Sequence, residues 1–186
     1  MRVFVALNLS DAERSRLADA AAGLRDAGFP VRWVAPENVH LTLKFLGEIP
    51  EARVPDVCSA VGEAAADLSS FAMAVGGFGA FPSLRRPQVV WVGVEPNSTL
   101  ASLHESLEGQ LALLGFPRED RPFRPHLTLG RTRRRAAPSE FRGLDELVKQ
   151  TEYRDTFQIR SVDVMQSRLM PRGPIYSVVH SADLEP

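Results

Sequence analysis

The stretch His40-Leu41-Thr42-Leu43 occurs twice in this chain, returning letter for letter as residues 126–129. Each copy alternates polar with apolar residues, which is typical of a β-strand. In such a strand the histidine and the threonine point to one face and the leucines to the other. The repeat therefore predicts one site that is built from two similar strands.

The residues around the two copies also correspond. An apolar run at 3–7 begins 37 residues before the first histidine, and a run at 89–94 begins 37 residues before the second. A helical pattern follows each run and ends at Gly28 or Gly115, because glycine is the residue that most often terminates a helix. We therefore expect the order strand, helix, motif strand, helix, strand to occur twice, as in an internal duplication.

These patterns predict the fold class α+β. We expect two pseudo-symmetric lobes, each a mainly antiparallel sheet with helices on the outside, and an active-site cleft between them. The whole chain, 1–186, is expected to form a single bilobal domain whose duplicated halves are roughly 1–80 and 88–186. A strand is predicted at 71–75, and the Gly- and Pro-rich stretch 76–87 is predicted to be a loop.

Composition limits the possible classes of protein. A hydrophobic content of 44% and a charged content of 24% are ordinary for a globular protein, so a buried core is expected. The single cysteine, Cys58, excludes an internal disulfide and a cysteine-based metal cluster. The opening apolar run is too short for a signal peptide or a membrane span. We expect a cytoplasmic protein with no membrane partner, acting as a monomer.

The chemistry that two facing histidines suit best is general acid–base catalysis at one phosphorus atom. In-line displacement needs a base where the nucleophile enters and an acid where the leaving oxygen departs, and histidine supplies both forms near neutral pH. His40 and His126 are therefore the candidate catalytic pair. Thr42 and Thr128 can donate hydrogen bonds to the non-bridging phosphate oxygens.

Two cations beside the motifs are candidate phosphate ligands. Strict alternation places Lys44 on the same face as His40, and sends Phe45 to the opposite face. Arg131 falls on the wrong face unless the strand bends or bulges near Gly130. The scheme requires no metal and no cofactor, because two histidines without a companion carboxylate cluster make a poor metal site.

Arginines gather around the second motif and suggest a polyanionic substrate. They comprise Arg118, Arg121 and Arg124 before it and Arg131, Arg133, Arg134 and Arg135 after it. Such a patch can follow an RNA backbone, although a solvated loop remains the alternative for the last three. Phe123, or another exposed aromatic residue, is a candidate for stacking on the terminal base. His104 and His180 are set aside as a helix-flank residue and a terminal residue.

Residues 37–47 and 122–131 resemble the two signatures of the two-histidine (2H) phosphoesterases. The resemblance spans nearly the whole chain and is nearest to the RNA 2′,3′-cyclic phosphodiesterases, historically called 2′-5′ RNA ligases. Gly130 departs slightly from the pattern, since alanine is also frequent at that place. The paired motifs are specific for the superfamily and less so for the substrate.

The resemblance implies hydrolysis of RNA 2′,3′-cyclic phosphate ends to 2′-phosphates. It gives His40 the role of proton donor to the leaving 3′ oxygen and His126 the role of base that activates water. Run backwards with an RNA 5′-hydroxyl, the same chemistry makes a 2′-5′ bond. Lys44, Arg131, Arg124 and Phe123 are the expected substrate contacts. The sequence by itself does not distinguish the acid from the base.

Two other functions remain open. The same site could act on small cyclic nucleotides, or the chain could bind RNA ends or nucleotides without turnover. The second is less favoured, because binding alone requires neither an acid nor a base.

Overall fold

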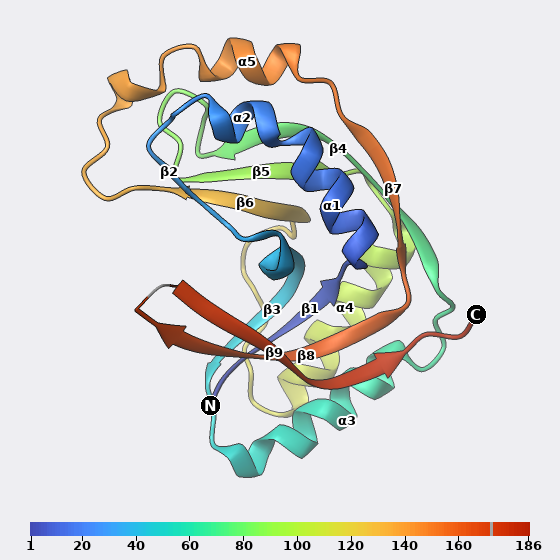
Figure 1. Cartoon of the computed structure of the whole chain (residues 1–186). Coiled ribbons are helices and arrows are strands. Elements are labelled where there is room, and N and C mark those ends of the chain that lie inside the picture. The colour runs from blue at the N-terminus through green and yellow to red at the C-terminus, as the bar shows by residue number, and fades with distance from the viewer. Residues whose placement is uncertain (172) are drawn as a thin grey trace.

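A computed structural model describes residues 1–171 and 173–186 (Figure 1). The strands are β1 (Arg2–Asn8), β2 (Val31–Trp33), β3 (His40–Glu48), β4 (Phe71–Phe81), β5 (Val89–Val94), β6 (His126–Thr132), β7 (Arg154–Ile159), β8 (Ser161–Met170) and β9 (Gly173–Asp183). The α-helices are α1 (Asp11–Ala20), α2 (Ala22–Asp26), α3 (Val54–Ala65), α4 (Ser98–Leu113) and α5 (Leu144–Gln150). Short 3-10 helices are η1 (Pro36–Asn38), η2 (Glu51–Arg53) and η3 (Pro138–Phe141).

The strands form a sheet in the order β7-β4-β5-β6-β3-β1-β8-β9, with β2 added beside β6. All these neighbours run antiparallel, which confirms the predicted α+β class with antiparallel sheets. We call β3-β1-β8-β9 lobe A and β7-β4-β5-β6 lobe B. Helices α3 and α4 pack together against lobe A, whereas α1, α2 and α5 lie over lobe B (Figure 1).

The strand order interlocks the two ends of the chain. β4 comes from the first half of the sequence but pairs with β5 and β7, and β8 comes from the second half but pairs with β1. The lobes meet where β3 pairs with β6 through Leu41 and Leu127. The pairing of β3 with β6 consists of this one residue pair, so the motif strands diverge on either side of it. The division of the sequence into duplicated halves stays a prediction.

The predicted loop at 76–87 is shorter than expected, since β4 continues to Phe81. The glycines that suggested a loop serve the strand instead. Gly77 has a φ of +70° beside a register shift in the β4–β5 ladder, a conformation that glycine adopts without strain. A Cβ at Gly79 would lie 2.3 Å from the indole of Trp91, so only glycine lets the ring cover the backbone.

The first helix begins as its sequence indicates. The Ser10 hydroxyl accepts a hydrogen bond from the Glu13 backbone N–H, and the Glu13 carboxylate accepts one from the Ser10 N–H at 2.8 Å. This reciprocal capping box satisfies two donors that the first turn leaves unpaired. It confirms the predicted start of α1.

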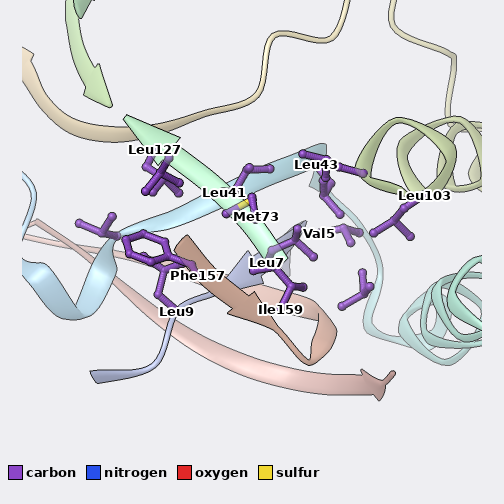
Figure 2. Packing of buried hydrophobic residues seen from close by; sticks show 14 of the residues in the cluster. Val5, Leu7, Leu9, Leu41, Leu43, Met73, Leu103, Leu127, Phe157 and Ile159 are labelled. Carbon is purple, nitrogen blue, oxygen red and sulfur yellow. The ribbon is translucent and has the colours of Figure 1, made fainter. Parts of the chain in front are cut away.

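The core lies between the sheet and the helices. Leu41 and Leu127 are fully buried there, close to Met73 and Phe157 (Figure 2). Burying each leucine contributes about 1.5–3 kcal/mol relative to an exposed one, so the motif strands are held by their apolar faces. Their histidines and threonines are thereby directed to the other face. No helix of the described residues is long and apolar enough to cross a membrane.

Candidate active site

A β-bulge changes the faces of the first motif strand. Ala6 pairs with Thr42 and Val5 pairs with Lys44, so Leu43 has no partner on β1. Side chains directly opposite in an antiparallel pair share a face. Val5 belongs to the main core, and Ala6 to a separate cluster on the opposite face. Thr42 therefore stays on the face of the cleft, and Lys44 turns to the core.

The expected position of Lys44 is corrected accordingly. Its ammonium group donates to both carboxylate oxygens of Glu108, at 2.8 and 2.9 Å, and to the carbonyl of Pro117 at 2.7 Å. These bonds use all three N–H groups of a side chain that is only 4% exposed. Phe45 takes the forward position instead, opposite Phe4 on the cleft face.

The second motif strand contains a bulge at the corresponding place. Trp91 pairs with Thr128 and Val89 pairs with Arg131, while Leu129 has no partner on β5. Since Trp91 and Val89 are two residues apart, Thr128 and Arg131 lie on one face. The irregularity that Arg131 requires is therefore present, and it brings the guanidinium to the cleft.

Gly130 lies under the short strand β2. A Cβ at this position would come 2.4 Å from Cγ1 of Val31 and 3.2 Å from the Arg32 carbonyl oxygen. Glycine in place of alanine at this position therefore fits the close packing of β2 on β6. Gly130 and Lys44 are the equivalent positions of the two strands. The bulge of β3 is followed by the buried ammonium group of Lys44, and that of β6 by a glycine without a side chain.

The two histidines are oriented by the same backbone interaction. Nδ1 of His40 lies 2.7 Å from the Asn38 carbonyl oxygen, and Nδ1 of His126 lies 2.7 Å from that of Arg124. A carbonyl only accepts, so each Nδ1 carries a proton, and the neutral form of either ring would present the Nε2 lone pair. The Thr42 hydroxyl can donate to Nε2 of His40, from 3.1 Å. Both rings are thus fixed in the tautomer that acid–base chemistry through Nε2 requires.

The surroundings of the two rings differ. His40 packs against Phe4, with ring centroids 4.9 Å apart, and against the edge of Tyr176 at 5.2 Å. His126 meets Phe81 edge-on at 5.0 Å. The ring of His40 is therefore enclosed by aromatic groups from β1 and β9.

Burial lowers the pKa of His40 to about 4. The hydrogen bond to the Asn38 carbonyl opposes this shift, and the positive charge of Arg14 adds to it. The Arg14 guanidinium donates to the Val39 carbonyl at 3.4 Å and to the Asn8 side chain at 3.2 Å, which holds it close to the motif. In the free protein His40 is consequently neutral at neutral pH.

A cleft of about 790 Å³ joins these groups, and it is lined by both histidines, both motif threonines and Arg131. Its wall includes residues of the segment 119–124. Arg124 and Phe123 therefore also border the cleft, where the sequence predicted substrate contacts. The ring of Phe123 already stacks on His104, with centroids 3.9 Å apart. One face of Phe123 is therefore occupied by a residue that the sequence did not indicate.

Sequence reasoning missed the aromatic lining of the cleft, which comprises Phe45, Phe81, His104 and Tyr176. These residues come from β3, β4, α4 and β9, and no local pattern connects them. Phe45 alone had a signal, since a bulge like the one required by Arg131 would have brought it forward. Tyr176 needs the strand order, which the sequence does not reveal.

Comparison with known proteins agrees with this geometry. The model of the family "LigT like Phosphoesterase" matches residues 7–91 and 92–176. The RNA 2′,3′-cyclic phosphodiesterase of Thermotoga maritima is 34% identical, covering 100% of this chain and 96% of the relative. That of Methanothermobacter thermautotrophicus is 32% identical, with 95% of each chain covered.

Solved structures show the same fold. TT0787 of Thermus thermophilus superposes with a TM-score of 0.82 at 28% identity, covering 99% of this chain and 98% of that one. E. coli LigT complexed with 3′-AMP gives a TM-score of 0.75 at 25% identity, covering 98% and 97%. With both family repeats matched and both His-x-Thr strands facing one cleft, the chain belongs to the LigT-like family of two-histidine phosphoesterases.

Proposed function

We propose that this protein hydrolyses the 2′,3′-cyclic phosphate at RNA ends to a 2′-phosphate, by acid–base catalysis with two histidines and without a metal. The observation that carries the proposal is the pair of His-x-Thr strands whose rings are fixed in the same tautomer beside one cleft. The names of the relatives from Thermotoga and Methanothermobacter support the substrate.

The reaction balances with two proton transfers. One histidine takes a proton from water as the water oxygen forms a bond to phosphorus, and the bond between phosphorus and O3′ breaks. The other histidine gives its proton to O3′, which leaves a 3′-hydroxyl and a 2′-phosphate. Thr42, Thr128 and Arg131 donate to the non-bridging oxygens, where negative charge is concentrated.

The resemblance assigns the proton donor to His40 and the base to His126. His40 is neutral in the free protein, so it must gain a proton before it can donate one. An anionic phosphate beside Nε2 favours the imidazolium and raises its pKa. In this proposal, substrate binding itself charges His40 and prepares the acid.

The remaining expected contacts have different roles in the proposal. Arg124 and Phe123 line the cleft and contact the nucleotide, with Phe123 offering the ring face that His104 leaves free. Lys44 acts at a distance instead, since it binds Glu108, whose carboxylate accepts a hydrogen bond from the Glu119 N–H at the start of the wall segment.

Ligation is the reverse reaction in this scheme, with an RNA 5′-hydroxyl in place of water. Small cyclic nucleotides remain an alternative substrate, which the 3′-AMP complex of E. coli LigT supports by the size of its ligand. Binding without turnover is the alternative from another class. We expect a cytoplasmic monomer, and the single cysteine fits a reducing compartment.

The test is incubation of the purified protein, with excess chelator, with a short RNA that ends in a 2′,3′-cyclic phosphate. We expect a 2′-phosphate product, separated from the 3′-phosphate isomer. An intact RNA with hydrolysed cyclic mononucleotide would select the small-substrate alternative. Saturable binding with no product from either substrate would select the binding module, and activity lost on chelation would contradict metal independence.

A further inference from the structure

Seven exposed arginines lie on β2, on β6 and in the segments that follow β4 and β6, and we call this group the arginine face. It comprises Arg32, Arg85, Arg86, Arg131, Arg133, Arg134 and Arg135. Backbone hydrogen bonds hold the three contributing segments together: the Thr132 N–H donates to the Gln88 carbonyl at 3.0 Å, and the Arg133 N–H donates to the Pro30 carbonyl at 2.8 Å. The arginines that follow the second motif are therefore part of a larger surface.

The arginine face carries uncompensated charge. Within residues 1–171 and 173–186, none of its members has a carboxylate oxygen within 4.0 Å, although the chain contains 23 acidic residues. Arg16, Arg25 and Arg118, which lie elsewhere, each pair with an acid. The whole chain has a net charge of −1, which does not reveal this local excess of positive charge.

The backbone brings two of these charges together directly. Arg32 of β2 is opposite Arg131 of β6, so both side chains leave the same face of the sheet. Like charges at opposed positions of a ladder destabilise it. Arg135 adds a left-handed φ of +71°, which arginine rarely adopts. An anionic ligand with several charges would offset the repulsion between these guanidinium groups, whereas a single phosphate engages only one or two of them.

The arginine face is continuous with the cleft. Arg131 belongs to both, and β6 leads from His126 in the cleft to Arg133 beyond its end. On lobe A the cleft is bordered by Phe45, whose apolar side chain is exposed. The paired ends of β8 and β9 extend to the same side as the segment after β6 (Figure 1). A polyanion that leaves the cleft on the side of lobe B therefore meets a group of arginines.

We propose that the arginine face binds the RNA strand on the 5′ side of the cyclic phosphate. The proposal rests on the function proposed above, because the reacting 3′ end is then fixed between His40 and His126. The preferred substrate is accordingly an oligonucleotide end and not a mononucleotide. Contacts from guanidinium groups to phosphates carry no base information, so the preference for length is independent of sequence.

Binding is measured first, since it does not depend on turnover. The triple variant Arg133→Ala/Arg134→Ala/Arg135→Ala is compared with Arg2→Ala/Arg154→Ala/Arg160→Ala, which removes three exposed arginines that lie outside the arginine face. The probe is a 5′-labelled single-stranded RNA with a 2′-phosphate end, titrated by fluorescence anisotropy at several salt concentrations. The variant with Arg133, Arg134 and Arg135 replaced should bind on the order of tenfold more weakly. Each lost phosphate contact should reduce the slope of log K against log salt concentration by about 0.7.

The control variant should bind like wild type. Wild-type affinity in the first variant, or equal weakening in both, would overturn the proposal, because the loss would then be absent or a matter of net charge alone.

Turnover supplies the second readout. The ratio of kcat/KM for a cyclic-phosphate oligonucleotide to that for a cyclic mononucleotide should fall in the first variant and stay constant in the control. A wild-type ratio near one would also overturn the proposal. If no substrate is turned over, the proposed function fails, while the anisotropy titrations still decide whether the arginine face binds RNA.

Discussion

The two motif strands share a catalytic frame and differ in what surrounds it. In both, a fully buried leucine anchors the strand, a backbone carbonyl two residues earlier orients the histidine, and a bulge follows the threonine. Beyond each bulge the strands differ. The first presents Phe45 to the cleft and buries Lys44, while the second presents Arg131 and has only Gly130 behind it.

This difference indicates a division of labour between the lobes. Lobe A surrounds His40 with Phe4 and Tyr176, an apolar setting that disfavours the charged ring. Lobe B supplies cations around His126. Lobe A is thus suited to controlling a proton and to holding a nucleobase, and lobe B to holding phosphates. The frame is symmetric because displacement at phosphorus needs two proton transfers, and the surroundings are asymmetric because the nucleotide is not symmetric.

The largest expected effect comes from removing either histidine. His40→Ala and His126→Ala should each lower turnover on the order of 10²–10⁴-fold, since each removes one proton transfer. The double variant should lose little more than the worse single variant, because residues that act as a unit are not additive. Single-turnover rates with circular dichroism as the folding control would check this. A near-normal rate in either variant would contradict the shared frame.

Breaking the buried ion pair should be the next largest effect, in stability. Lys44→Met leaves the buried Glu108 carboxylate without its lysine counter-charge, although the hydrogen bond from the Glu119 N–H remains, and this costs about 3–5 kcal/mol. Lys44→Met/Glu108→Leu should recover most of this loss in urea unfolding. Arg118→Ala breaks the exposed pair with Glu105 and should change stability little. If the single Lys44 variant were as stable as wild type, the pair would not anchor the wall of the cleft.

The equivalent positions Phe45 and Arg131 can be compared directly. Arg131→Ala should lower kcat/KM by about 10²–10³, because it removes a donor to the charged phosphate oxygens. Arg131→Lys should recover only part of this, since lysine lacks the paired donors. Phe45→Ala should act mainly on KM, by less than about tenfold, through lost apolar contact. A larger effect of Phe45→Ala on kcat would reverse the roles assigned to the two lobes.

The sequence predicted the parts of this site that depend on short periods. Alternation placed His40, Thr42, His126 and Thr128 correctly on the faces of their strands, because leucines in between fix the register against the core. The same rule was wrong for Lys44, since a bulge adds one residue and reverses every face after it. At Arg131 the requirement for a bulge was foreseen, because strict alternation puts this side chain on the wrong face and Gly130 allows the strand to bend or bulge.

The remaining features depend on the order of strands in space. Tyr176 reaches His40 only because β8 inserts beside β1 and carries β9 with it. The ion pair of Lys44 depends on where α4 packs, and the pairing of Arg32 with Arg131 depends on β2 joining β6. Such contacts link residues that no local pattern relates, so the sequence alone could not predict them.

The effect that is smallest near neutral pH, and that grows only in acid, is a pH dependence of stability that belongs to His40. Its pKa is about 4 in the folded protein and near 6.5 in the unfolded chain, so the unfolded state binds the extra proton first as the pH falls. Stability from this group is complete above about pH 6.5, declines as the pH falls towards 4, and amounts to on the order of 3 kcal/mol. Urea unfolding between pH 4 and 7 should show this slope in wild type and lose it in His40→Gln. Inorganic phosphate should raise the pKa of His40 measured by NMR titration, because an anion at Nε2 stabilises the imidazolium. A pKa near 6.5 in the phosphate-free protein would mean that lobe A does not control the proton, and the contrast between the lobes would then rest on Arg131 alone.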